Sequence, residues 1–306
     1  MENTLNEKIK IGISACMYGS KVRYNSKGFD ILGHLKREKN DFLWTPICPE
    51  VMSGLSVPRS SIRLIGGNGF DFWEGSAQIK NRFGKNVSRM LKAGTLSCFE
   101  TLKRVDVDAY IFMEGSPTCG IYRTTLKKES LGKPPGIFGA LLLKEQMFLI
   151  PALDLQSPLK WWDWKRRLVA FTWFKRKDPN TLCEFLECWD ILKILCQEID
   201  EESSENINNS LKNFSNKTDP KKFKEIQIEI LNILRKPSNP EKIKKWLWEN
   251  YNFLKNTHGV EAEKIRHPED LRGVTHVAEE MLRVELEARK VKKCFSSSPI
   301  DYAPGR

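Results

Sequence analysis

The sequence lacks any long apolar run, and this absence excludes one class of protein. No stretch of the 306 residues approaches the roughly 20 uninterrupted apolar residues that a membrane-spanning helix needs. The first ten residues, MENTLNEKIK, are polar and do not resemble a signal peptide. We therefore expect a cytoplasmic protein.

Histidine is also scarce, and this argues against two kinds of site. The four histidines are scattered, and none has a second metal ligand or a cysteine at a useful spacing. They are His34, His258, His267 and His276. A zinc site or a cysteine hydrolase using Cys48 or Cys119 therefore lacks a suitably placed histidine. The eight cysteines are plentiful by contrast, and in the cytoplasm clustered thiols indicate metal binding or catalysis and not a disulfide framework.

The chain is long enough for about two packed domains, since 40% of its residues are hydrophobic. Its net charge of +11 is unevenly distributed along the chain. Residues 1–150 hold 22 Lys and Arg against 14 Asp and Glu, and residues 151–306 hold 28 Lys and Arg against 25 Asp and Glu. A basic surface attracts anions such as RNA, but many proteins that bind only small molecules are equally basic. RNA therefore stays open as a partner.

The first half predicts an α/β fold. Short apolar runs, each followed by a turn signal, predict four buried strands. These runs are IKIGIS (9–14), FLWTPI (42–47), AYIFM (109–113) and MFLIPA (147–152). Polar stretches of helical length lie between them, most clearly residues 77–105, whereas GGNG (66–69) predicts a turn. This alternation predicts an open parallel-sheet, Rossmann-like domain with helices on its faces.

The second half predicts an all-α helical domain. Apolar residues recur at helical spacing in segments that are separated by polar runs, notably residues 200–220. The segments are 159–177, 181–199, 223–236, 241–256 and a last one near 271–293. We expect domains at 1–156 and 157–295, followed by a flexible tail at 296–306 that lacks core-forming residues.

Three cysteines follow three of the predicted strands. Cys16 lies in ISACMYG, Cys48 in TPICPEV and Cys119 in GSPTCG. In an open parallel sheet the ligand crevice lies beyond the carboxyl ends of the strands, so we expect all three thiols to meet there. Their spacing matches no zinc finger or ferredoxin run, because the fold and not a local loop would gather them. Simple burial of two or three of these thiols is the alternative.

The segments ISACMYGSKVRYN, CPEVMSGLSVPR and GSPTCG resemble the three signature segments of the 2-thiouracil desulfurase (TudS-like) family, over roughly residues 8 to 152. The resemblance implies a 4Fe-4S cluster held by Cys16, Cys48 and Cys119, with one iron free for substrate sulfur. It also implies catalytic roles for Glu50 and Ser116. The chain departs from the family at Thr118, where members usually carry serine.

The chemistry of these residues agrees with that resemblance. Soft thiolates select iron-sulfur clusters or zinc, and three ligands leave one iron exposed as a Lewis acid. Such an iron can bind the sulfur of a thiocarbonyl while a carboxylate activates water. Glu50, two residues from Cys48, suits the base, and Ser116 could orient the base or the water. Alternatively, Glu50 only stabilises the start of a helix.

We therefore predict a cluster-dependent, non-redox desulfurase acting on a thiolated pyrimidine, either 2-thiouracil or thiouridine in RNA. The alternative is a non-enzymatic RNA-binding or sulfur-trafficking protein in which the iron-sulfur cluster is structural. Residues 160–167, KWWDWKRR, interleave aromatic and basic side chains as single-stranded nucleic-acid sites do. The helical spacing of Trp161, Trp164, Leu168 and Phe171 favours a core or interdomain face instead.

Overall fold

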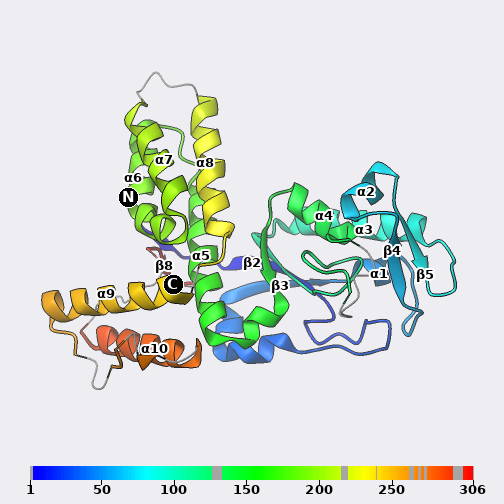
Figure 1. The fold of residues 1–306 in the computed structure, drawn as a ribbon, viewed down its shortest axis with the longest axis horizontal. Coiled ribbons are helices and arrows are strands. Elements are labelled where there is room, and N and C mark those ends of the chain that lie inside the picture. Colours follow the sequence, from blue (N-terminus) through cyan, green and yellow to red (C-terminus); the bar gives the residue numbers. More distant parts are fainter. Residues whose placement is uncertain are drawn as a thin grey trace. The chain divides into compact units, whose positions relative to one another are not determined.

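The structure is a computed structural model that describes residues 3–125, 133–214, 220–238, 240–261, 265–267, 270–271, 274–291 and 299–305. The chain divides into two compact units (Figure 1). One comprises Lys8–Gln156, and the other combines Met1–Glu7 with Ser157–Arg306. The first residues thus group with the second unit, although the sequence assigned them to the first domain.

A four-stranded parallel sheet forms the centre of the first unit. Its strands are β2 (Ile9–Ser14), β3 (Phe42–Ile47), β6 (Ala109–Phe112) and β7 (Phe148–Pro151), in the order β3-β2-β6-β7. All three neighbouring pairs are parallel. The four predicted strands are therefore confirmed. Ile9, Ile11 and Ile13 are fully buried, as expected for a central strand of a parallel sheet.

Helices cover this sheet, which confirms the predicted α/β class for the first unit. The helical segments are η1 (Ile31–Asp41), α1 (Pro49–Met52), α2 (Gly69–Glu74), α3 (Ser88–Val105), α4 (Ile137–Lys144) and η2 (Ala152–Gln156). Leu102 of α3 and Phe138 of α4 pack in one apolar cluster with Tyr110 of β6. A Cβ on Gly12 would come within 2.6 Å of the Tyr110 ring, so the close packing here requires glycine.

The stretch 77–105, predicted to be helical, is helical only in its second part. Residues Gln78–Asn81 form strand β5, which pairs antiparallel with β4 (Ile62–Ile65). The Asn81 side chain then accepts from the backbone N–H groups of Phe83 and Lys85, both at 3.0 Å, and closes a turn before α3. Asparagine side chains stabilise such turns against helix, which explains the error.

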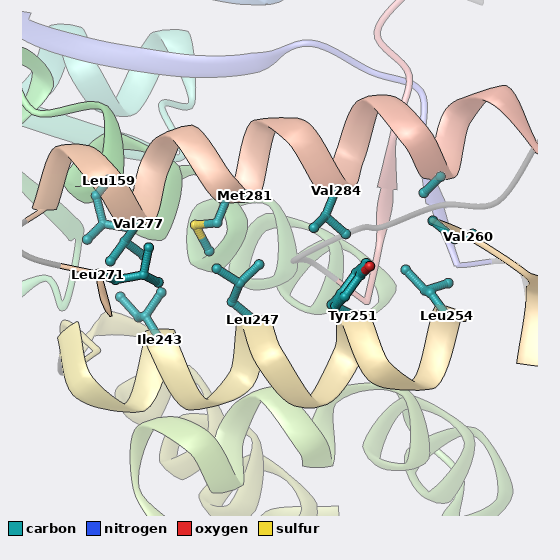
Figure 2. Close-up of a cluster of buried hydrophobic side chains, with 11 residues drawn as sticks. Leu159, Ile243, Leu247, Tyr251, Leu254, Val260, Leu271, Val277, Met281 and Val284 are labelled. Carbon is teal, nitrogen blue, oxygen red and sulfur yellow. The ribbon is translucent and has the colours of Figure 1, made fainter. Parts of the chain in front are cut away.

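The second unit is mainly helical, as predicted. Its helices are α5 (Pro158–Lys177), α6 (Leu182–Ile199), α7 (Glu201–Lys212), α8 (Pro220–Arg235), α9 (Pro240–His258) and α10 (Val274–Lys290). Figure 2 shows α9 and α10 facing each other across an apolar cluster that includes Leu247, Tyr251 and Met281. Among the described residues no helix is long and apolar enough to cross a membrane.

Two expectations for the second unit differ from the structure. The polar run 200–220 contains a helix, α7, because Asp200 caps it at Ser203 N (3.1 Å) and Ile207 and Leu211 are buried on one side. No strand was predicted in the tail, but strand β8 (Asp301–Tyr302) pairs parallel with β1 (Thr4–Leu5). Residues this far apart in sequence give no local signal of their pairing. Residues 296–298 and 306 of the predicted flexible tail lie outside the described residues.

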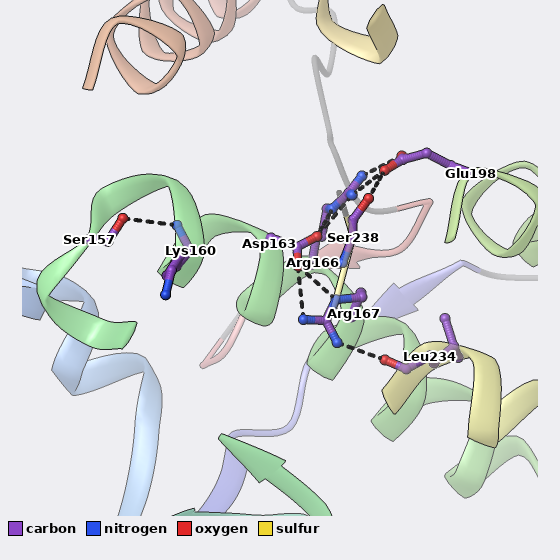
Figure 3. Close-up of polar contacts among 8 residues, drawn as sticks. All are labelled: Ser157, Lys160, Asp163, Arg166, Arg167, Glu198, Leu234 and Ser238. Atoms are coloured by element: carbon purple, nitrogen blue, oxygen red, sulfur yellow. Dashed lines mark hydrogen bonds and ion pairs between the residues drawn. The ribbon is translucent and has the colours of Figure 1, made fainter. Parts of the chain in front are cut away.

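The segment KWWDWKRR (160–167) lies in helix α5 and contributes to the buried core of the second unit. Trp161 and Trp164 are buried, and Arg167 is fully buried. Figure 3 shows that Asp163 binds both Arg166 and Arg167, while Arg166 also binds Glu198 of α6. The favoured interpretation as a buried face is therefore confirmed, and these aromatic and basic groups do not form an exposed platform for nucleic-acid bases.

Candidate functional site

A cavity of about 410 Å³ opens beyond the carboxyl ends of β2, β3 and β6. Its volume lies within the range of small-molecule sites. All five residues proposed from the sequence line it, together with the last residue of β2. They are Ser14, Cys16, Cys48, Glu50, Ser116 and Cys119. The parallel topology thus brings together thiols that are up to about a hundred residues apart in the chain.

The three thiols influence one another across this cavity. Burial, followed by the neighbouring Cys48, raises the pKa of Cys16 to about 12. Burial followed by the charge of Glu50 raises the pKa of Cys48. Cys119 is buried, and burial and then Cys48 raise its pKa well above the usual value. Without a cation the three thiols therefore stay protonated at neutral pH, whereas a bound metal centre would stabilise the thiolates.

The donor set has the chemistry that an iron-sulfur cluster requires. Among the described residues, no three His, Cys, Asp or Glu side chains are gathered tightly enough to hold one metal ion. The three converging donors are all sulfur, and they come from three separate loops around one cavity. Sulfur-only ligation is typical of iron-sulfur clusters, and a cluster spans more space than one ion. The residues therefore fit an iron-sulfur cluster.

Short turns hold the first two cysteines. The Cys16 carbonyl accepts from Phe29 N at 2.7 Å, and the Cys48 carbonyl accepts from Met52 N at 2.9 Å in the first turn of α1. A Cβ on Gly94 of α3 would clash with the Ser53 backbone, so α3 approaches the end of α1 closely. This packing fixes α1, which carries Glu50 in its first turn and Cys48 at its N-cap.

Ser116 organises the turn that carries Cys119. Its hydroxyl oxygen accepts from the backbone N–H groups of Thr118 and Cys119, both at 3.1 Å. Its carbonyl accepts from Gly120 N at 2.9 Å. The sequence suggested that Ser116 orients the base or the water, and the structure adds that it shapes this turn. Its hydroxyl proton remains available for a further acceptor.

The Glu50 carboxylate is held on both oxygens. Arg59 donates from Nε to Oε2 at 3.1 Å and contacts the same oxygen through Nη2. The Thr118 hydroxyl donates to Oε1 at 3.0 Å. Arg59 is itself fixed by donating from Nη1 to the Val22 carbonyl at 2.9 Å. Glu50 is in the first turn of α1, but its side chain is directed to these partners and not to the helix start.

Sequence reasoning missed several residues of the site. Arg59 and Thr118 lie within two of the quoted segments, but nothing in their spacing reveals that both bind Glu50. Burial and then Cys48 raise the pKa of Cys16, and the positive charge of Arg23 partly offsets this by lowering it. The buried Glu114 accepts from the backbone N–H groups of Tyr122 and Arg123, both at 3.0 Å, and so holds the segment after Cys119.

The first half of the chain is similar to known proteins. The family model of 2-thiouracil desulfurase matches residues 11–153. The chain is 31% identical to the "Uncharacterized protein YbbK" of Bacillus subtilis (strain 168) over 152 residues, 48% of this chain and 98% of that protein. A solved structure of the [4Fe-4S]-dependent thiouracil desulfidase TudS is 25% identical and covers 47% of this chain and 91% of that chain, with a TM-score of 0.39. Through its first half, the chain belongs to the 2-thiouracil desulfurase family.

Proposed function

We propose that this protein is a non-redox desulfurase of thiolated pyrimidines, acting on 2-thiouracil or on thiouridine in RNA. In this reaction the oxygen of water replaces sulfur on the ring carbon, and the C=S bond breaks. Both protons of the water leave with sulfur as hydrogen sulfide, and no electrons are exchanged with an outside donor. The observation that carries the proposal is the convergence of three thiols and Glu50 on one cavity.

Cys16, Cys48 and Cys119 would hold a 4Fe-4S cluster in this cavity. When bound, the cluster supplies a Lewis-acidic iron without a protein ligand, which suits the soft sulfur of a thiocarbonyl. The protein sets the positions of the three thiols. These thiols would release their protons when the cluster binds, because the ligands must be thiolates.

Glu50 is the proposed base for the attacking water. Its Oε2 is occupied by Arg59, whereas Oε1 accepts one hydrogen bond from Thr118 and keeps a second lone pair. We infer that the water binds at Oε1 and transfers its proton there. Arg59 removes the side-chain freedom that would misplace the water. Ser116 could donate its remaining hydroxyl proton to the pyrimidine or to the water.

Anaerobic assembly followed by single-substrate assays tests this proposal. Protein purified without oxygen should contain iron and acid-labile sulfide in equal amounts. It should then form uracil and sulfide from 2-thiouracil, or release sulfide from thiolated RNA, with no added reductant. A full cluster with no sulfur release from either substrate would favour the non-enzymatic alternative. Zinc without sulfide in the wild-type protein would overturn the cluster assignment.

A further inference from the structure

A positively charged ribbon adjoins the cavity, and the proposed reaction gives it no role. Residues 75–99 contain five Lys or Arg and no Asp or Glu. They comprise strand β5, the turn that follows it and most of α3. Strand β4, which pairs with β5, adds a further cation, Arg63. A surface whose positive charges have no acidic neighbours along the chain suits an anionic partner.

Strands β4 and β5 form a two-stranded ribbon with one buried face (Figure 1). Leu64 and Ile79 are register partners and both are buried, so they face the core. Side chains alternate along a strand, so Arg63 and its partner Lys80 lie together on the other face. Like charges directly opposite each other destabilise a sheet. Among the described residues neither cation forms an ion pair, so an anionic ligand would relieve this repulsion.

The ribbon is continuous with the rim of the cavity. Ser61 and Arg63 both line the cavity that the three thiols share. The backbone N–H of Arg82 donates to the Ser61 carbonyl at 3.0 Å, so the turn after β5 lies against this rim. Arg82 and Lys85 of that turn are exposed. The positive charges therefore extend from the mouth of the cavity outward over the turn.

The same turn presents an aromatic ring to solvent. Phe83 is 73% exposed, and the Arg82 guanidinium lies 4.6 Å from the centre of its ring. Sites for single-stranded nucleic acids combine cations that bind phosphates with aromatic rings on which bases stack. An acidic protein segment would use the cations but has no base to stack on the ring. The turn therefore matches a nucleic-acid strand better than an acidic peptide.

We propose that this ribbon and its turn bind a strand of RNA beside the cavity. The site comprises four cations and one aromatic residue: Arg63, Lys80, Arg82, Lys85 and Phe83. The cations bind phosphate groups of the strand, and Phe83 stacks on a base next to the thiolated nucleotide. The inference rests on the proposed function, because it places the thiolated pyrimidine of that reaction within RNA. It selects thiouridine in RNA over the free base as the substrate.

The test measures binding of a fluorescein-labelled oligouridine to the full-length, anaerobically purified protein by fluorescence anisotropy at several salt concentrations. The variants are Lys80→Gln, Arg82→Gln, Lys85→Gln and the triple variant, and Arg63 is left unchanged because it lines the cavity. Each phosphate contact with a single strand contributes about 0.7 to the slope of log affinity against log salt. Each single variant should therefore bind about fivefold more weakly at about 0.1 M salt, and the triple variant about 100-fold more weakly.

Two further variants separate stacking from charge and from general basicity. Phe83→Leu should weaken binding about tenfold with the wild-type salt slope, because it removes a stacking surface and no charge. Arg104→Gln is the matched control, since Arg104 is an exposed cation in the last turn of α3, at the opposite end of that helix from the ribbon. It should keep the wild-type affinity and salt slope.

The outcomes separate this inference from the proposed function. Wild-type affinity in the triple variant, or no RNA binding by wild type, would overturn the RNA site, whereas the desulfurase would still be judged by turnover of 2-thiouracil. Polyglutamate that displaces the RNA as well as unlabelled oligouridine does would assign the ribbon to acidic proteins instead. An equal loss of affinity for uridine monophosphate would assign it to one phosphate and not to a strand. If the triple variant loses RNA binding but wild type releases sulfur from no thiolated substrate, the proposed function fails and the RNA site stands.

Discussion

Arg59 donates to Glu50 from Nε at 3.1 Å, and its guanidinium approaches the same carboxylate oxygen with Nη2. The side chains of both residues are largely buried, with exposed fractions of 6% for Arg59 and 15% for Glu50. This guanidinium holds Oε2, and the Thr118 hydroxyl at 3.0 Å holds Oε1, so the carboxylate is fixed at both oxygens. The pair therefore determines where the second oxygen of Glu50 is directed.

Replacing Arg59 with lysine keeps the charge and removes this geometry. A lysine ammonium cannot bind Glu50 through two nitrogens while also reaching the Val22 carbonyl. We expect Arg59→Lys to lower kcat by about 10- to 100-fold with the cluster retained, because a small misplacement of a catalytic group has effects of this size. Steady-state kinetics beside iron and sulfide quantitation would measure this. Wild-type kcat in the lysine variant would show that the charge alone is sufficient.

Glu50→Gln should preserve the shape of the site and remove the base. The rate should fall by about 10²- to 10⁴-fold, which is the usual contribution of a general base, while substrate affinity changes little. Uracil formation from 2-thiouracil under anaerobic conditions measures the effect. Glu74→Gln, at an exposed carboxylate of α2, is the matched control and should turn over normally. Normal turnover by Glu50→Gln would reject the proposed role of this residue.

Thr118 allows a separate test of the second Glu50 oxygen. Thr118→Ser keeps the hydroxyl, so the rate should stay within a few-fold of wild type. Thr118→Val has nearly the same shape but leaves Glu50 Oε1 without this donor. A hydrogen bond to a charged group contributes about 1.5–3 kcal/mol, so kcat should fall by about tenfold or more. Equal rates for the valine and serine variants would contradict this role.

Each of the three cavity thiols should be needed for the cluster. Cys16→Ser, Cys48→Ser and Cys119→Ser should each lose the brown chromophore when purified without oxygen, since hard alcohol ligands bind iron-sulfur clusters poorly. Cys98→Ser is the control, because Cys98 is fully buried in α3 and does not line the cavity. Absorption spectra with iron and sulfide quantitation report the result. Loss of the chromophore only in the control would refute the assignment.

The sequence was sufficient to predict which cysteines meet. Cys16, Cys48 and Cys119 each follow a strongly apolar strand, and parallel strands place their carboxyl ends at one edge of a sheet. The contacts of Glu50 could not be predicted, because they depend on how two loops pack together. The same is true of Ser14 and Tyr110, which are 96 residues apart and meet only through the sheet.

The elements that were missed had weak local patterns. Strand β5 is four residues long, so its alternation of buried and exposed side chains is too short to distinguish from a helix. Helix α7 is polar apart from Ile207 and Leu211, and its start is specified by the Asp200 cap. The pairing of β8 with β1 joins the two ends of the chain, and such distant contacts leave no periodic pattern in either segment.

The buried ion pairs of α5 predict how the second unit responds to acid. Asp163 is 4% exposed and binds Arg166 at 2.9 Å and Arg167 at 2.8 Å. Burial would raise the pKa of Asp163, but the guanidiniums of Arg167 and Arg166 outweigh it and hold that pKa below its usual value. A carboxylate with a lowered pKa stabilises the fold above its unfolded pKa of about 3.9, and this stabilisation is lost as the pH falls through the folded pKa.

Asp163→Asn should therefore destabilise the protein by about 3–5 kcal/mol at pH 7, because it leaves two buried guanidiniums without their shared partner. Urea unfolding followed by far-ultraviolet circular dichroism measures the free energy of unfolding at pH 7 and pH 3. Asp190→Asn is the control: its pair with Lys193 at 2.9 Å is exposed, so the change should stay within about 1 kcal/mol. Wild type should lose more stability than Asp163→Asn between pH 7 and pH 3, since only wild type has this carboxylate to protonate. If the two proteins lose equal stability over that interval, Asp163 does not carry the acid sensitivity.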